Sequence, residues 1–379
     1  MKVSKRSEIP PFYAMEVLKA ANEREADGTR VMHMEVGEPG AGTPAKVLAA
    51  AARALKEDPL GYTEALGLPE LRRAIAGHYR DAYDLAVPEE RIAVTTGSSG
   101  GFLLTLVSAF DAGDRIGLGV PYYPAYTNMV RALNLEAVPI ATTARTHFQP
   151  TPELVAQAGR LDGLLVASPA NPTGSMLNDA ELSALSAYCE AEGIRLISDE
   201  IYHGITYGAP AVSALAHGLN AVVLNGFSKY FCMTGWRLGW MVLPDDLLRP
   251  VERIAQNLFV SPPNISQRAA VAAFGCREEL DANVAVYAEN RRLLLDELPE
   301  IGIKDLAPAD GAFYIFANVS HLTNDSSDWC RRLLDEAAVA ITPGVDFDPE
   351  RGAAYVRISF AGSTDDIREI IRRLRDWLA

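Results

Sequence analysis

The stretch NGFSKYFCMTGWRLGW, residues 225–240, places Lys229 and Arg237 among aromatic and aliphatic residues. A charge inside an apolar run is costly to bury unless a partner compensates it. A lysine in apolar surroundings has a lowered pKa, and its neutral amine is a good nucleophile. A solvated surface lysine is the alternative, and the neighbours that disfavour it are Phe227, Tyr230, Phe231 and Met233. The stretch therefore predicts a site for an electrophile beside an anion.

Three other short segments carry groups that suit such a site. TGSSGG (96–101) has the small residues that expose backbone N–H groups to an anion, although a plain turn with a serine N-cap explains it as well. SPANPTG (168–174) holds Asn171 between two prolines, where an Asx-turn is the alternative. ISDEIYH (197–203) contains two acids, which suit a metal, a ribose hydroxyl or a helix cap. None of the three segments is decisive alone.

Short apolar strands alternating with helices must position these groups. Strands of this kind indicate a mostly parallel sheet covered by helices on both faces. Such a sheet binds its ligands at the carboxyl ends of its strands, where the segments above lie. The expected strands are 91–97, 115–121, 162–169, 193–200, 220–226 and 238–244, with helices expected at 100–110 and 179–191.

The two ends of the chain have a different character. Helices are expected at 12–26, 45–56, 66–83, 281–298, 327–338 and 364–379, and strands at 311–319, 337–344 and 355–361. This mixture is typical of a smaller α+β domain. We therefore expect a large domain over 44–276 and a small domain formed by 1–43 and 277–379.

Composition narrows the class of protein. The chain has 379 residues and a net charge of −14, which argues against a general nucleic-acid-binding surface. No apolar run follows the basic residues near the N-terminus, and no stretch suits a membrane span. The four cysteines are far apart and form no metal-ligand spacing, so we expect free thiols in a reducing cytoplasm.

The groups at the strand ends form one set: a lysine nucleophile, an arginine, a phosphate-type loop and a carboxylate. Pyridoxal phosphate requires this set. At these motifs the sequence resembles the fold type I pyridoxal-phosphate enzymes, specifically the class I/II aminotransferases of the aspartate aminotransferase superfamily. The resemblance runs from about Phe12 to the C-terminus, and its most specific motifs are SPANPTG, SDEIY, SKYFCMTGWRLG and YVRISFA, in this order.

The resemblance implies roles for the residues around the cofactor ring. Lys229 matches the lysine that forms the Schiff base and then acts as general base. Asp199 matches the carboxylate that pairs with the pyridine nitrogen. Tyr202 and Asn171 match the groups that hydrogen-bond the phenolic oxygen, and Tyr123 matches the aromatic residue that stacks on the ring.

The resemblance also implies a phosphate cup. Ser228 and Arg237 match phosphate ligands, and the phosphate-binding turn corresponds to Ser98, Ser99 and Gly100. Tyr62 matches a tyrosine that reaches the phosphate of the neighbouring subunit, which implies a homodimer with shared active sites.

For the substrate, the resemblance implies that Arg357 grips the α-carboxylate through its fork of donors and that the backbone of Gly37 approaches the same carboxylate. Asn171 also matches a substrate contact. The implied reaction transfers an amino group from an α-amino acid, with an apolar or aromatic side chain, to a 2-oxo acid in ping-pong fashion. Further pocket candidates are Phe12, Tyr13, His203 and Tyr207.

The sequence departs from the family pattern in two places. GEPGAGTP (37–44) lacks the aromatic residue and the acid that are usual in this loop, and Ser99 stands where an aspartate-specific branch has a lysine. A carbon–sulfur β-lyase on the same fold remains an alternative. A cofactor-bound transcription regulator is disfavoured because the match begins near residue 12, and a nicotinamide enzyme is disfavoured because TGSSGG lacks G-x-G-x-x-G.

Overall fold

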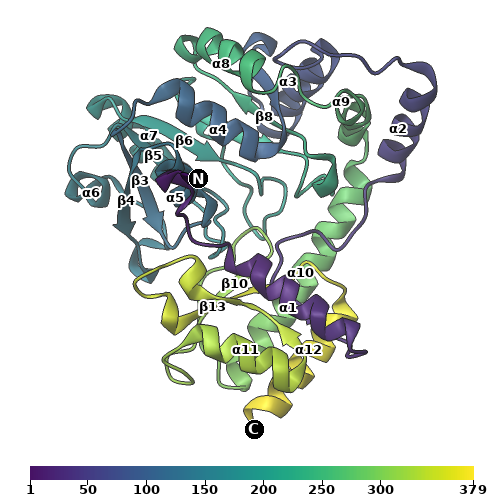
Figure 1. Ribbon diagram of the computed structural model, residues 1–379, viewed down its shortest axis with the longest axis vertical. Helices are drawn as coiled ribbons and strands as arrows, with labels where there is room; N and C mark the ends of the chain where they lie inside the picture. Colours follow the sequence, from purple (N-terminus) through teal and green to yellow (C-terminus); the bar gives the residue numbers. More distant parts are fainter.

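The computed structural model describes residues 1–379 and is built around a seven-stranded sheet with the order β2-β8-β7-β6-β5-β3-β4 (Figure 1). Strand β8 is antiparallel to both of its neighbours, and every other pair is parallel. The strands are β2 (Ile92–Thr95), β3 (Arg115–Val120), β4 (Glu136–Ala141), β5 (Gly163–Ala167), β6 (Arg195–Asp199), β7 (Val222–Gly226) and β8 (Gly239–Val242). The expected mostly parallel sheet is confirmed, with β4 as an additional edge strand.

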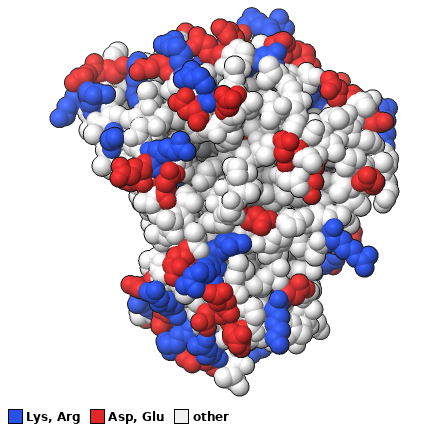
Figure 2. All heavy atoms as spheres, turned by 180° about the vertical axis from the view of Figure 1, so that it is seen from behind, with Lys and Arg blue, Asp and Glu red and all other residues white.

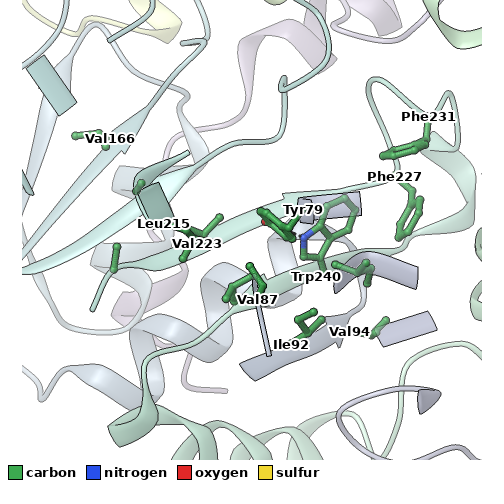
Figure 3. Close-up of a cluster of buried hydrophobic side chains, with 14 of the residues drawn as sticks. Tyr79, Val87, Ile92, Val94, Val166, Leu215, Val223, Phe227, Phe231 and Trp240 are labelled. Carbon is green, nitrogen blue, oxygen red and sulfur yellow. Dashed lines mark hydrogen bonds between the residues drawn. The ribbon is translucent and has the colours of Figure 1, made fainter. Parts of the chain in front are cut away.

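Alternation along each strand sends side chains to two separate apolar layers. In β8, Trp240 and Val242 belong to one layer and Met241 belongs to the other. Figure 3 shows the first layer, where Trp240 lies beside Tyr79 and Phe227. The indole N–H of Trp240 donates to the Tyr79 hydroxyl at 3.2 Å, so the one polar atom of the buried indole ring is satisfied.

Helices cover both faces of the sheet. Helices α4, α5 and α8 contribute to one apolar layer, and α3, α6 and α7 contribute to the other. Helix α3 begins at Pro69 rather than at residue 66, because proline suits the first position of a helix, where its missing N–H costs nothing. The helices of this part are α2 (Ala45–Glu57), α3 (Pro69–Tyr83), α4 (Gly97–Ala109), α5 (Ala125–Ala132), α6 (Pro152–Gln157), α7 (Asp179–Glu192), α8 (Asp245–Leu258) and α9 (Asn264–Ala270).

A four-stranded antiparallel sheet, with the order β12-β13-β10-β9, forms the second part of the molecule. A two-residue parallel pairing of β1 (Met32–His33) with β11 (Val339–Ala340) ties the N-terminal segment to it. Its other elements are α1 (Tyr13–Ala26), α10 (Arg277–Glu300), β9 (Asp305–Leu306), β10 (Tyr314–Asn318), α11 (Ser326–Ala337), β12 (Thr342–Pro343), β13 (Tyr355–Ser359) and α12 (Thr364–Leu378). We propose the division into 44–276 and 1–43 plus 277–379 as domains, a division that this pairing supports.

Charges of both signs are interspersed on the face seen in Figure 2. On α12, Arg372 pairs with Glu369 at 2.8 Å and with Asp376 at 2.7 Å. Such exposed pairs one helical turn apart contribute only a few tenths of a kcal/mol each. None of the helices is long and apolar enough to cross a membrane.

Candidate active site

The predicted residues converge on one cavity of about 360 Å³ at the carboxyl ends of β6 and β7. Residues of the N-terminal segment and of the four-stranded sheet close its other side. All but two of the predicted site residues line it: Gly37, Ser98, Ser99, Tyr123, Asn171, Asp199, Tyr202, Ser228, Lys229, Arg237 and Arg357.

Lys229 follows β7 and is partly buried, with its amine inside the cavity. Its Nζ donates a hydrogen bond to the carbonyl of Gly37 at 2.5 Å and lies 5.9 Å from the centre of the Tyr202 ring. Burial, together with the nearby positive charges of Arg357 and Arg237, lowers the pKa of Lys229 to about 8. A substantial fraction of this amine is therefore neutral and nucleophilic near neutral pH.

Asp199 ends β6 and is buried beneath the cavity. The hydroxyl of Tyr126 donates to its Oδ2, and the backbone N–H of Ile201 donates to its Oδ1 at 3.1 Å. Burial raises the pKa of Asp199 to about 6, although both hydrogen bonds and the charge of Lys229 oppose that rise. A buried carboxylate of this kind favours a cationic partner such as a protonated ring nitrogen.

The neighbouring acid, Glu200, does not share a site with Asp199. Its Oε1 accepts hydrogen bonds from Ser213 Oγ at 3.0 Å and from the backbone N–H of Ala214 at 2.8 Å. Burial raises the pKa of Glu200 to about 8. Of the two acids in ISDEIYH, Asp199 lines the cavity, whereas Glu200 anchors the chain at residues 213–214.

The N-terminus of α4 faces the same cavity without a side-chain cap. Thr96 makes no capping bond, so N–H groups of the first helical turn stay available, and Ser98 and Ser99 line the cavity beside them. Gly97 leaves room for Arg237, because a Cβ at this glycine would lie 2.8 Å from the Arg237 guanidinium. Free amides, hydroxyls and a guanidinium at one helix N-terminus suit a phosphate group.

Arg357 comes from β13 of the four-stranded sheet, and only 1% of it is exposed. Its guanidinium donates to Asn171 Oδ1 at 3.0 Å and to the backbone carbonyl of Glu35. It lies between two aromatic rings, with its Cζ 4.5 Å from the centre of the Tyr314 ring and 4.7 Å from that of Phe347. The Nε atom is buried without a partner, so the group retains a donor for a ligand.

Two of the predicted residues lie outside this cavity. Gly100 is buried one position further along α4. Tyr62 is 88% exposed on the surface, and its contact with a neighbouring subunit stays a prediction. Of the further candidates, Phe12 lines the cavity. His203 lies below the cavity, where it hydrogen-bonds Tyr83 and Ser168. Tyr207 does not line the cavity, and its hydroxyl donates to the carbonyl of Ala312. Tyr13 does not line the cavity either.

Sequence reasoning missed two tyrosines of the site, Tyr126 and Tyr314. Tyr126 follows Tyr123 by one helical turn in PYYPAY, and this spacing was a usable signal. Tyr314 had no such signal, because its partner Tyr202 lies in a distant part of the chain and the two hydroxyls meet only after folding, at 2.8 Å.

The residues present fit the pyridoxal phosphate that the resemblance implies. The uncapped N-terminus of α4 with Ser228 and Arg237 matches a phosphate, and Asp199 matches a pyridinium nitrogen. Tyr123 offers a ring at the cavity wall, and Lys229 offers an amine of lowered pKa. The donor set therefore matches each chemical group of the cofactor.

Comparison with known proteins identifies the family of the chain. The family model described as aminotransferase class I and II matches residues 29–374. The valine–pyruvate aminotransferase of Mycobacterium tuberculosis is 50% identical over 382 residues, covering 100% of this chain and 98% of that protein. The (5-formylfuran-3-yl)methyl phosphate transaminase of Methanocaldococcus jannaschii is 35% identical, covering 97% of this chain and 96% of that protein.

A solved structure agrees as well. The crystal structure of an aminotransferase from Mycobacterium tuberculosis matches with a TM-score of 0.98 and 50% identity, covering 100% of this chain and 99% of that chain. The similarity extends over both the large sheet and the four-stranded sheet, since it covers the whole chain.

Proposed function

Because the chain belongs to the class I and II aminotransferases, it moves an amino group from an α-amino acid to a 2-oxo acid, and we propose that it does so with pyridoxal phosphate in the cavity. Its fold is the expected fold type I architecture, an α/β sheet flanked by helices with a smaller α+β part. The observation that carries the cofactor proposal is Lys229, a lysine of lowered pKa in one cavity with Asp199 and the uncapped start of α4.

Substitution of Lys229 tests the cofactor proposal. The purified protein with added pyridoxal phosphate should show a visible absorbance band, and Lys229→Ala should abolish it. Borohydride reduction followed by peptide mapping should place the cofactor on Lys229 in the unsubstituted protein. A band that persists in Lys229→Ala, with a reducible adduct elsewhere, would overturn the assignment.

Different residues of the chain have different roles in the proposed reaction. Bound pyridoxal phosphate supplies the ring that accepts electrons from the substrate Cα. Arg357 binds the substrate α-carboxylate and so fixes the direction of the Cα–H bond. Lys229, once its amine is free, takes the proton from that Cα as a general base. Tyr202 and Asn171 line the cavity and would hydrogen-bond the phenolic oxygen of the bound cofactor. A second oxo acid would complete the ping-pong cycle.

We further propose a donor amino acid with an apolar side chain. Helix α1 and the residue before it place Phe12, Met15 and Leu18 at the cavity wall, and the 50% identical relative is a valine–pyruvate aminotransferase. A panel of valine, phenylalanine and aspartate, each without an acceptor, should bleach the visible band most readily with an apolar donor. Faster bleaching by aspartate than by valine would contradict this proposal.

The carbon–sulfur β-lyase alternative has no support from these relatives. A direct assay separates it from transamination, because a lyase releases pyruvate and ammonia from cysteine conjugates while the visible band persists. Bleaching of the band by valine, with no ammonia from a cysteine conjugate, is the result expected of the aminotransferase.

A homodimer with shared active sites is also proposed. The loop of Tyr62 is held against residues 261–264, since the backbone N–H of Thr63 donates to Ser261 and Asn264 donates to the carbonyl of Gly61. The neighbouring Leu258 and Val260 are about half exposed, an arrangement that a second copy would cover. Light scattering should give a mass near twice 41.0 kDa, and Tyr62→Ala should weaken cofactor binding without changing the fold.

We propose a cytoplasmic location, which the four free thiols support. Cell fractionation with an antibody against the chain tests it, and recovery in the membrane or secreted fraction would contradict it.

A further inference from the structure

Tyr314 lies between Arg357 and Tyr202 in the candidate active site, and the proposed function assigns it no role. It lies in β10, where Phe316 pairs with Arg357 of β13, so Tyr314 is the diagonal neighbour of Arg357 on the same face of the sheet. Only 1% of Tyr314 is exposed, and it lines the cavity. Its ring is stacked against the guanidinium of Arg357, and its hydroxyl lies 2.8 Å from that of Tyr202.

The fold makes room for this ring and its hydroxyl at Gly37. A Cβ on Gly37 would lie 1.7 Å from the Tyr314 oxygen and 2.7 Å from its Cζ, so any residue other than glycine at position 37 would displace it. A phenylalanine at 314 would keep the stacking on Arg357 without needing the space taken by the oxygen. Gly37 therefore fits closely against both the ring and its hydroxyl, and this contact fixes where the hydroxyl lies.

Either hydroxyl can donate the 2.8 Å hydrogen bond that joins the two tyrosines. Each hydroxyl has one hydrogen to donate, and a buried one needs an acceptor. The Tyr202 oxygen is the sole hydrogen-bond partner of the Tyr314 hydroxyl. Both tyrosines line the cavity, so the hydrogen that this bond does not use can point into it; if Tyr314 donates, that free hydrogen belongs to Tyr202.

We propose that Tyr314 is a positioning residue with two actions: its hydroxyl donates to Tyr202 and so aims the Tyr202 hydrogen at an acceptor oxygen in the cavity, while its ring holds Arg357. The proposal rests on the proposed function, because the acceptor is the phenolic oxygen of pyridoxal phosphate. One side chain thereby links the group that binds the cofactor oxygen to the group that binds the substrate carboxylate.

Tyr314→Phe separates the two actions, because it removes the hydroxyl and keeps the ring. The measurement is a pH titration of the visible absorbance of the bound cofactor, with no substrate and no turnover. Tyr202 without its donor is a poorer hydrogen-bond donor to the phenolic oxygen, so the anionic oxygen is less stabilised and the titration midpoint should rise. Loss of one neutral hydrogen bond corresponds to a rise of about 0.5–1 pH unit.

The ring has its own readout. Tyr314→Phe should leave the KM of the donor amino acid within about twofold, whereas Tyr314→Leu, which removes the stacking on Arg357, should raise it about fivefold to tenfold. Tyr207→Phe is the matched control: that hydroxyl is also hydrogen-bonded, to the Ala312 carbonyl, and Arg291 lies 5.3 Å from its ring centre, but it is outside the cavity. Tyr207→Phe should titrate like the unsubstituted protein.

A Tyr202→Phe background supplies the decisive comparison. Tyr314→Phe should add no further shift there, because its effect passes through the Tyr202 hydroxyl. An unchanged or lowered midpoint in Tyr314→Phe, an equal shift in Tyr207→Phe, or an additive shift in the double variant would each overturn the proposal. Absence of a visible band in the unsubstituted protein would instead overturn the proposed function, so the two failures are distinguishable.

Discussion

The hydroxyl of Tyr126 donates a hydrogen bond to Oδ2 of Asp199, and both groups are buried under the cavity. The second carboxylate oxygen is held by the backbone N–H of Ile201 at 3.1 Å. The carboxylate therefore has a fixed orientation before any ligand arrives, which lowers the reorganisation that binding a ring nitrogen requires.

Tyr126→Phe should weaken cofactor binding, and most strongly at low pH. The pKa of Asp199 is already raised to about 6 by burial, and the Tyr126 bond opposes that rise, so its removal should move the pKa higher. Because the ionised carboxylate pairs with the pyridinium, the pH below which cofactor dissociates should also move upward. Loss of a hydrogen bond to a charged group costs about 1.5–3 kcal/mol, roughly tenfold to a hundredfold in the dissociation constant.

Fluorescence titration with pyridoxal phosphate between about pH 5 and 8 measures this effect. Tyr122→Phe, a neighbouring buried tyrosine outside the cavity, is the control. Equal cofactor affinity of Tyr126→Phe and the unsubstituted protein at every pH would mean that the bond serves packing alone.

Reaction of the apoprotein with pyridoxal phosphate should accelerate as pH rises and level off above the Lys229 pKa of about 8. The neutral amine is the reacting form, and burial is the main cause of its lowered pKa. The negative charge of Glu38 raises this pKa, so Glu38→Gln should move the midpoint to lower pH. Stopped-flow absorbance measures the rate of this reaction at each pH. Glu23→Gln, a change at an exposed position of α1, is the control and should have the same midpoint as the unsubstituted protein. A midpoint moved to higher pH by Glu38→Gln would contradict the assignment of Lys229 as the reacting amine.

Arg357→Lys should weaken donor binding far more than cofactor binding. Lysine keeps the charge but loses the fork of donors and the flat contact with Tyr314 and Phe347. Truncation of a buried, hydrogen-bonded charge typically costs about 2–5 kcal/mol, so the donor KM should rise about thirtyfold or more. Arg351→Lys, which lies outside the cavity and donates to the Thr142 carbonyl, is the control. Equal losses of donor and cofactor affinity would assign Arg357 a structural role.

Asp346→Ala should loosen α1 and raise the donor KM together. The Asp346 carboxylate accepts the backbone N–H groups of Tyr13 and Ala14, each at 3.2 Å, and so caps a helix whose own N-cap residue has no capping side chain. Loss of such a cap costs about 1 kcal/mol. Hydrogen exchange of residues 13–26 should rise several-fold; unchanged exchange with an altered KM would contradict this explanation.

The same carboxylate predicts a pH effect on stability. Burial raises the pKa of Asp346 from 3.8 to about 6, so the folded state binds the proton more tightly than the unfolded state. Its stabilising contribution is then complete below pH 3.8 and is lost as pH rises through about 6. Asp346→Asn should make the unfolding free energy flatter across this window, and denaturant titrations at several pH values measure it.

The strands and helices that carry the predicted site residues could be located from the sequence, because the apolar strand patterns and the residues that begin and end helices agree in that part of the chain. The capping box of Asn178 and Glu181 and the left-handed Gly193 set the ends of α7 where the pattern placed them. Strand β4 was not predicted, because Pro139 weakens its strand pattern. A proline is tolerated there, since β4 pairs with a single neighbour at the sheet edge.

By itself, the sequence determined the mostly parallel sheet, the residues at its strand ends and their resemblance to one enzyme family, because these depend on local pattern and spacing. The tertiary structure alone decided which tyrosines meet Asp199 and Tyr202, how Arg357 is held between two rings, and that Glu200 turns away from the cavity. Such contacts join residues far apart in the chain, and their energies depend on burial and on distances that no local pattern encodes.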